Sequence, residues 1–274
     1  MKLMQFLKNG MPALGIVTER GVIDAAGTDP FAPTSMAALC RVGEDALPLL
    51  EEIAKNEKAA VVDPKRLVYA PVITYMEKIL CIGLNYRAHA AEVKKEEPVC
   101  PAVFSKFPNT LAAHNQIVKI PAGARKIDYE AELAVIVGRN KKPMAYTVGN
   151  DLSIREWQNE SPTWTVGKNA DGFGPLGPVA VTADSIDADD LAIEMRRNGE
   201  VVQSSRTSDM IFSVEKLLEY LDARIPLKPG DVIFTGTPSG VIIGQPYEQR
   251  VWLKPGDVLE ASIEGIGTLR TQLG

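Results

Sequence analysis

Residues 128–138 read DYEAELAVIVG, an acidic start that passes into an apolar run and ends at a glycine. The run predicts a buried β-strand over Glu130 to Val137. Because side chains alternate along a strand, Glu130 and Glu132 leave on the same face, about 6.5–7 Å apart. Two carboxylates beside apolar surface repel each other unless a cation lies between them, and their oxygens suit a hard divalent ion. From this motif alone, a solvated edge strand stays an alternative.

A second motif lies in residues 85–92 (NYRAHAAE), within a helix predicted from Asn85 to about Lys95. His89 and Glu92 are three residues apart and therefore share one helix face. A carboxylate partner fixes the tautomer of an imidazole and raises its basicity, as a general base requires. An incidental surface pair explains the same spacing.

A third motif, GNDLSIREWQ, covers residues 149–158, and Lys168 follows ten residues later. Asp151 would complete a site of three carboxylates that leaves metal positions free for water and substrate. Lys168 lies among glycines and aromatic residues, where an ammonium group can meet a buried anion; a solvated loop lysine is the alternative. Arg155 and Gln158 fit either this site or the surface of a helix.

Composition excludes several classes of function. The 274 residues are 45% hydrophobic and 24% charged, as in an ordinary globular protein, and the net charge of -5 argues against a nucleic-acid binder. No segment approaches the roughly 20 apolar residues of a membrane span. Three cysteines without a CxxC spacing suit a reducing compartment, so we expect a cytoplasmic protein. Two histidines are too few for a zinc site of several histidines.

The chain divides into two predicted parts. Residues 1–72 form a small N-terminal α/β domain, with two short strands within 13–23 and a helix over 46–56. Pro71 marks the crossing into residues 73–274, which are mostly β. The expected fold class is α+β.

The second part is rich in strand and turn signals. The hexapeptide LKPGDV occurs twice, at Leu227–Val232 and Leu253–Val258, and each copy predicts a turn that leads into a strand. The other predicted elements are strands over 79–83 and 191–195, a hairpin at Asn198-Gly199 and a helix over 212–221.

From residue 79 to 274 the chain resembles the fumarylacetoacetate hydrolase family, in an acylpyruvase-like form. The motifs that carry the resemblance, in family order, are CIGLNYRAHAAE (81–92), DYEAELAVIVG (128–138), GNDLSIREWQ (149–158), GKNADGFGPLGP (167–178), NGEVVQSSRTSDMIFS (198–213) and KPGDVIFTGTPSGV (228–241). The resemblance implies a mixed β-roll catalytic domain, a homodimer, and Mg²⁺ or Mn²⁺, with Ca²⁺ as a substitute, on Glu130, Glu132 and Asp151. The first seventy residues resemble a small extra domain that many bacterial members carry.

The resemblance also implies roles for other side chains. His89 and Glu92 match a pair on a lid that orders over the ligand, Lys168 and Gln158 match positions that hold substrate or attacking water, and Arg155, Lys106 and Thr237 match positions near the ligand's carboxylate or oxo group. Many members have Lys-Ser-Phe-Asp where residues 168–171 read KNAD. This departure is expected to widen the pocket or change its polarity, so no named substrate is transferred.

The resulting hypothesis is hydrolysis of a carbon–carbon bond in a small 2,4-dioxo acid, such as an acylpyruvate or a diketo-deoxy sugar acid. The substrate's carboxylate and 2-oxo group would chelate the cation. His89, oriented by Glu92, would activate water, and Lys168 and Gln158 would stabilise the oxyanion. The main alternative is a decarboxylase or isomerase of an unsaturated 2-oxo-dicarboxylate, through a metal-bound enolate. A ureidoglycolate-type lyase and a catalytically silent ligand-binding protein are further alternatives.

Overall fold

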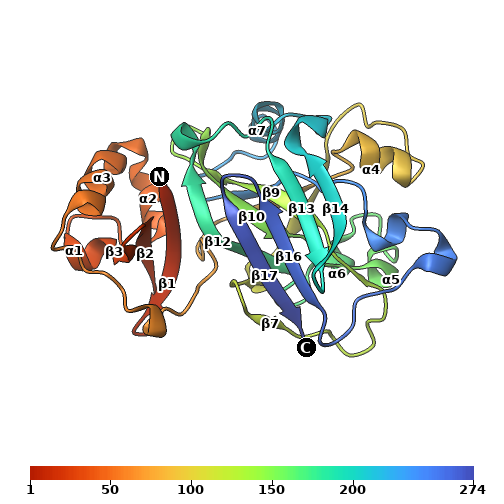
Figure 1. Cartoon of the computed structure of the whole chain (residues 1–274). Helices are drawn as coiled ribbons and strands as arrows, with labels where there is room; N and C mark the ends of the chain where they lie inside the picture. Colours follow the sequence, from red (N-terminus) through yellow and green to blue (C-terminus); the bar gives the residue numbers. More distant parts are fainter.

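The computed structural model describes residues 1–274 and contains a ten-stranded sheet, a five-stranded sheet and a two-stranded pair (Figure 1). The ten-stranded sheet comprises β1 (Lys2–Lys8), β2 (Met11–Thr18), β3 (Gly21–Asp24), β4 (Ile79–Gly83), β5 (Ala102–Lys106), β6 (Leu111–Ala112), β9 (Ala131–Val137), β10 (Pro143–Asn150), β12 (Gly174–Thr182) and β15 (Val232–Phe234). The five-stranded sheet comprises β7 (Ile117–Val118), β13 (Ala192–Arg197), β14 (Glu200–Arg206), β16 (Val258–Ile263) and β17 (Gly267–Leu273). The pair is β8 (Ile127–Asp128) and β11 (Ser153–Ile154).

The helices are short and lie around the sheets. They are α1 (Ala25–Thr28), α2 (Met36–Val42), α3 (Leu47–Lys55), α4 (Arg87–Glu92), α5 (Arg155–Gln158), α6 (Thr165–Lys168) and α7 (Val214–Asp222). The chain is thus a mixed α/β fold that is mostly β, as the sequence predicts at this level. None of its helices is both long and apolar enough to cross a bilayer.

Strand β9 lies inside the larger sheet, between β10 and β15, and all seven of its residues are buried. Leu133 and Val135 point into the core that the two sheets share, whereas Ala134 and Ile136 point into a second core. This alternation confirms the predicted period of the strand. Its first residue is Ala131, one residue later than the sequence predicts.

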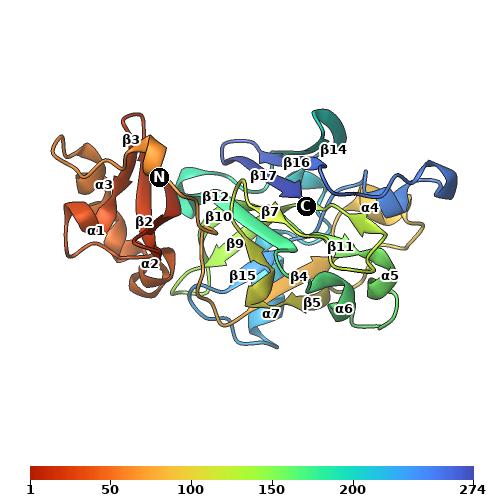
Figure 2. The same ribbon diagram turned by 90° about the horizontal axis from the view of Figure 1, so that it is seen from below.

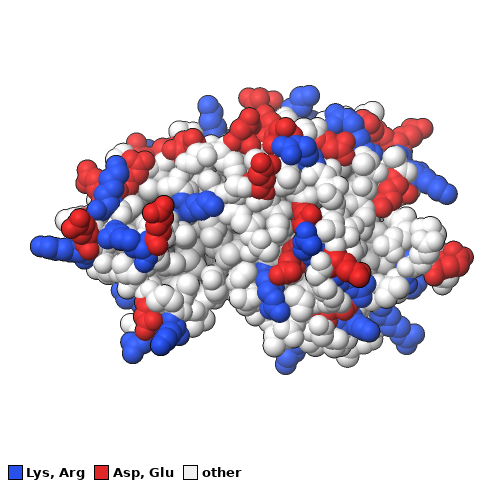
Figure 3. Space-filling view, viewed as in Figure 1, with Lys and Arg blue, Asp and Glu red and all other residues white.

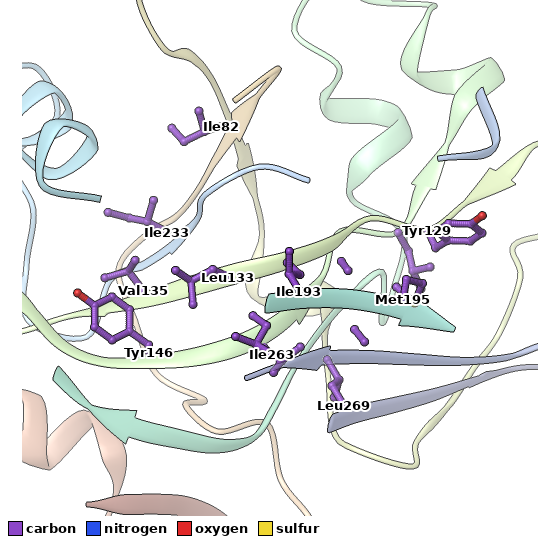
Figure 4. Close-up of a cluster of buried hydrophobic side chains, with 14 of the residues drawn as sticks. Ile82, Tyr129, Leu133, Val135, Tyr146, Ile193, Met195, Ile233, Ile263 and Leu269 are labelled. Atoms are coloured by element: carbon purple, nitrogen blue, oxygen red, sulfur yellow. The ribbon is translucent and has the colours of Figure 1, made fainter. Parts of the chain in front are cut away.

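The shared core fills the space between the two sheets (Figure 4). Leu133 of β9 faces side chains such as Ile193 of β13, Ile263 of β16 and Leu269 of β17. Dense packing of this kind holds β9 in one position, because a slip of one residue would turn its acidic side chains into apolar surroundings.

The first seventy residues lie on one side of the molecule (red to orange in Figures 1 and 2). Strands β2 and β3 confirm the predicted pair, and β1 is an additional strand that the sequence analysis does not identify. β1 pairs with β12, with Leu3 opposite Ala180, so the larger sheet continues from the N-terminal strands into the rest of the chain. The second core likewise joins Leu3 to residues such as Ile136. A domain boundary at residue 72 stays a prediction.

The predicted elements of the second part are present; β4 has the predicted ends, and the others are shifted by a few residues. Helix α4 spans Arg87–Glu92 and is shorter than predicted, and Lys94 just beyond it adopts a left-handed φ of 55°. Both LKPGDV copies form turns before β15 and β16, with Gly230 at φ 93° and Gly256 at φ 92°.

Surface charge is mixed on the face shown in Figure 3, where acidic and basic side chains alternate. No continuous basic area covers this face. The arrangement matches the small net negative charge of the chain.

Candidate metal centre and substrate cavity

The three predicted carboxylates converge where two neighbouring strands meet. Glu130 directly precedes β9, Glu132 is its second residue, and Asp151 directly follows β10. The backbone N–H of Asp151 donates to the carbonyl oxygen of Glu130 at 2.9 Å, which places the two residues side by side. One carboxylate oxygen from each residue lies within 4.8 Å of the others, and all three residues are buried.

The charges and free oxygens of this cluster fit a divalent cation. Glu132 forms no ion pair and accepts only from the backbone N–H of Gly236, at 2.8 Å, whereas the buried Asp151 Oδ1 lies 2.7 Å from Lys106 Nζ. Four buried carboxylates meet three buried cations here, namely Asp128, Glu130, Glu132 and Asp151 against Lys106, Arg155 and Lys168. An oxygen-only donor set suits Mg²⁺, Mn²⁺ or Ca²⁺ and does not distinguish among them.

The two glutamates are in opposite electrostatic environments. Burial would raise the pKa of Glu130, but Lys168 and Arg155 more than offset this effect and lower its pKa to about 2. Burial, Asp151 and Glu130 together raise the pKa of Glu132 well above its usual range. Glu132 is therefore the carboxyl group that lacks a countercharge.

Lys168, at the end of α6, bridges two of the three acids. Its Nζ donates to Glu130 Oε2 at 2.6 Å and to Asp151 Oδ2 at 2.7 Å. Burial would lower the pKa of Lys168, but Asp151 and Glu130 outweigh burial and raise it. Lys168 is thus a fixed positive charge at the carboxylates.

Lys106 and Arg155 form further contacts with the carboxylates of the centre. Lys106 Nζ lies 2.7 Å from Asp151 Oδ1 and donates to the carbonyl oxygens of Lys168 and Phe173, at 2.5 and 2.9 Å. Arg155 Nη2 donates to Glu130 Oε1 at 2.7 Å. These contacts indicate that both side chains position the acids, and contact with the substrate stays a prediction for each of them.

The remaining donors of Arg155 tie the centre to neighbouring segments. Its Nε donates to Asp128 Oδ2 at 2.9 Å, and its Nη1 donates to Gln158 Oε1 at 2.8 Å. Asp128 also accepts from the backbone N–H groups of Ile242 and Ile243, at 2.9 and 3.0 Å. Asp128 is a site residue that the sequence analysis does not assign, although it opens the quoted acidic stretch.

A cavity of about 320 Å³ opens on this centre. It is lined by Ile82, Gly83, Leu84, His89, Val93, Lys95, Phe104, Glu130, Glu132, Arg155, Gln158, Asn159, Trp164, Lys168, Thr237 and Ile243. Of the ten predicted site residues, Glu92, Lys106 and Asp151 are not among the lining residues. Phe104, Trp164 and Lys95 line the cavity without having been predicted, because no local pattern marks them as neighbours of the acids.

The predicted dyad is assembled at the cavity. His89 Nδ1 lies 3.2 Å from Glu92 Oε2, and Glu92 Oε1 accepts from the backbone N–H of Gly240 at 2.9 Å. Glu92 also packs so closely on Gly244 that a side chain at that position would collide with it. The imidazole is therefore oriented through its Nδ1, which leaves Nε2 as the ring atom available for proton exchange.

Thr237 is less available to substrate than the resemblance implies, and the two residues that depart from the family pattern, Asn169 and Ala170, lie outside the cavity. Thr237 lines the cavity, but its hydroxyl donates to the carbonyl oxygen of Ala131 and accepts from Gln203, both at 2.9 Å. Asn169 donates to backbone carbonyl groups, and Ala170 packs against the shared core. Neither of these two residues lines the cavity, so the KNAD departure lies outside it.

Comparison with known proteins gives matches over the whole chain. The family model "Fumarylacetoacetate (FAA) hydrolase C-terminal" matches residues 78–274. A protein named "Oxaloacetate tautomerase fahd2, mitochondrial" from Xenopus laevis is 35% identical, covering 98% of this chain and 89% of its own. The solved fumarylacetoacetate hydrolase of Exiguobacterium antarcticum is 31% identical with a TM-score of 0.85, covering 100% and 99% of the two chains. The solved 5-carboxymethyl-2-hydroxymuconate delta-isomerase of Mycobacterium smegmatis is 28% identical with a TM-score of 0.77, with the same coverage.

Proposed function

Because this chain belongs to the fumarylacetoacetate hydrolase family, we propose that it is a divalent-metal-dependent enzyme that interconverts the keto and enol forms of a small 2-oxo dicarboxylate such as oxaloacetate. The buried trio of Glu130, Glu132 and Asp151, in which Glu132 forms no ion pair, is the observation that carries the proposal. The choice of tautomerisation is supported by the relative that matches 98% of the chain. It follows the alternative in the sequence analysis rather than its main hypothesis of carbon–carbon hydrolysis.

The cation, when bound by the three carboxylates, would polarise a 2-oxo group as a Lewis acid and make the proton on the neighbouring carbon more acidic. Lys168 and Arg155 keep Glu130 ionised and in place for this task. Their donors are held by carboxylates and Gln158, so neither side chain needs to reorganise when substrate enters.

His89 is the group placed to move the proton. Its Nδ1 contacts Glu92, and the side chain lines the cavity. In the keto-to-enol direction, Nε2 would accept the proton that leaves carbon 3, and a proton would be returned at the oxygen of carbon 2. The reverse transfer regenerates the keto form, so the dyad ends each cycle in its starting protonation state.

One unpaired lysine in the cavity supports the proposal that the substrate is a dicarboxylate. Arg155 and Lys168 are already paired with the acids of the centre. Lys95 lines the cavity, is exposed, and has no carboxylate partner. A second carboxylate on the substrate would find its countercharge at Lys95.

Hydrolysis of an acylpyruvate is the second candidate, because the His89–Glu92 pair could equally activate a water molecule. The solved relative from Exiguobacterium antarcticum, which is named as a hydrolase, supports this reading. The homodimer and the cytoplasmic location from the sequence analysis stay predictions, and the Xenopus relative is named as mitochondrial.

One experiment separates these activities. Purified protein with Mg²⁺ is mixed with oxaloacetate enriched in its enol form, and decay of the enol absorbance is followed alongside pyruvate release from oxaloacetate and from acetylpyruvate. We expect fast, chelator-sensitive enol decay without matching pyruvate release. Pyruvate release from acetylpyruvate at a higher rate would favour hydrolysis, and no metal-dependent change with any substrate would contradict both candidates.

A further inference from the structure

The cavity has an aromatic wall that the proposed reaction does not use. Phe104 of β5 and Trp164, which directly precedes α6, meet edge to face, with ring centroids 5.5 Å apart and planes at 71°. Lys168 Nζ lies 5.0 Å from the centroid of the Phe104 ring. The wall therefore runs from the carboxylates through Lys168 and Phe104 to Trp164.

Trp164 is held in place by its own backbone and by Gly83. It adopts a left-handed conformation, with φ 60° and ψ -6°, which is unfavourable for a bulky side chain. Its N–H donates to Ser161 and its carbonyl oxygen accepts from Gly167, both at 3.1 Å, so a local turn fixes this conformation. A strained residue that lines a cavity is a candidate for a functional constraint.

Gly83 and Leu84 form the side of the cavity wall that faces Trp164. A Cβ added to Gly83 would lie 2.5 Å from Trp164 Cζ3, so the indole packs directly on the backbone of Gly83. The next residue, Leu84, is also left-handed, with φ 57°, and lines the cavity. The cavity wall thus contains two left-handed residues, Leu84 and Trp164, on either side of the close contact between Gly83 and the indole.

We propose that Trp164 limits the length of the substrate beyond carbon 4 and so restricts the enzyme to short oxo-acids. This inference rests on the proposed function, because it assumes that the 2-oxo-carboxylate end binds at the metal centre. A substrate anchored there extends past Lys168 and Phe104 before it meets Trp164. The other apolar residues of the cavity, Ile82, Val93 and Ile243, would surround a longer tail if the indole were absent.

The test measures affinities of the Mg²⁺-loaded protein for oxalate, which has no tail, and for 2-oxohexanoate, which has one, by calorimetry. In Trp164→Ala we expect the oxalate affinity to stay at the wild-type value. The ratio of the 2-oxohexanoate affinity to the oxalate affinity should rise at least about 10-fold over the wild-type ratio. Trp164→Phe, which keeps an aromatic ring, should give an intermediate ratio and guards against a folding defect in the alanine variant.

Trp157→Phe is the matched control, because Trp157 packs against the shared core and does not line the cavity. It should leave the ratio of the two affinities unchanged. A ratio in Trp164→Ala that stays at the wild-type value, or that falls, would overturn the inference. Absence of metal-dependent oxalate binding in the wild-type protein would instead contradict the proposed function, so the two failures are distinguishable.

Discussion

Lys168 Nζ lies 2.6 Å from Glu130 Oε2, so a positive charge that lines the cavity directly contacts a predicted metal ligand. Glu130 keeps its pKa at about 2 despite burial because Lys168 and Arg155 stabilise the carboxylate. Glu132, only two residues away, has no such partner. The centre therefore combines one carboxylate that is ionised by its protein environment with one that needs a bound cation.

Lys168→Met should destabilise the metal-free protein by about 3 kcal/mol or more, because it leaves Glu130 and Asp151 buried without their shared countercharge. The free energy of unfolding in urea with chelator measures the effect. Lys141→Met is the control, since Lys141 pairs with Asp222 at the surface, where solvent screens the charges, and its loss should cost much less. Similar losses in the two variants would refute the assigned role of Lys168.

Mg²⁺ should stabilise the wild-type protein by about 2.7 kcal/mol at a concentration 100 times its Kd, as binding to the native state alone requires. Glu132→Gln should abolish this gain, because an amide cannot replace the missing negative charge. In chelator the variant should have nearly the stability of the wild-type protein. The raised pKa of Glu132 favours its neutral form, which an amide replaces closely. Thermal unfolding with and without Mg²⁺ measures both effects, and an undiminished Mg²⁺ shift in Glu132→Gln would exclude this residue as a ligand.

His89→Ala should lower the rate of enol decay by about 100-fold or more while preserving the Mg²⁺-dependent thermal shift. The imidazole is proposed to transfer the proton, whereas the metal ligands lie on β9 and next to β10. Glu92→Gln should give a smaller loss, because it weakens the orientation of the ring and leaves the ring itself in place. Wild-type activity in His89→Ala would assign proton transfer to another group.

Lys95→Gln should raise KM for oxaloacetate by up to about 5-fold, the expected contribution of one exposed ion pair. The effect should shrink at high salt, because exposed charges are screened. Inhibition by pyruvate, which has no second carboxylate, should not change. Lys94→Gln is the matched control, because the neighbouring Lys94 does not line this cavity. An equal effect of both substitutions would mean that Lys95 acts only through net charge.

Asp257→Asn tests the second LKPGDV turn. Asp257 Oδ2 accepts from Arg197 at 2.6 Å and from the N–H of Lys254 at 3.0 Å, and Oδ1 accepts from Asn198 at 2.9 Å. Burial raises the pKa of Asp257, but these hydrogen bonds outweigh burial and lower it. We expect a loss of about 1–3 kcal/mol at pH 7.

The pH dependence of this loss has a fixed sign. A carboxyl group with a lowered folded-state pKa stabilises the protein above its unfolded pKa of about 3.9, and this stabilisation disappears as the pH falls through the folded-state pKa. Urea unfolding of wild type and Asp257→Asn at several values between pH 7 and pH 3 should therefore show a difference that shrinks on acidification. A difference that grows at low pH would contradict the assignment.

The amino-acid sequence by itself determined the local features of the site. Strand periodicity places Glu130 and Glu132 on one face, and helical spacing pairs His89 with Glu92. The Pro-Gly pairs in the two hexapeptides predict the turns. These predictions succeed because each depends on neighbours within a few residues. Asp151 is a more distant partner: its own motif suggests it as the third carboxylate, and the order of the family motifs supports that assignment.

Only the tertiary structure decided which distant side chains meet. The pairing of β1 with β12 joins the N-terminal strands to the larger sheet, and no local pattern marks it. The contacts of Arg155 with Asp128 and Glu130, and the approach of Trp164 to Gly83, likewise depend on how separate segments pack. Local periodicity sets the direction in which a side chain leaves its element, whereas packing of the whole core decides what that side chain touches.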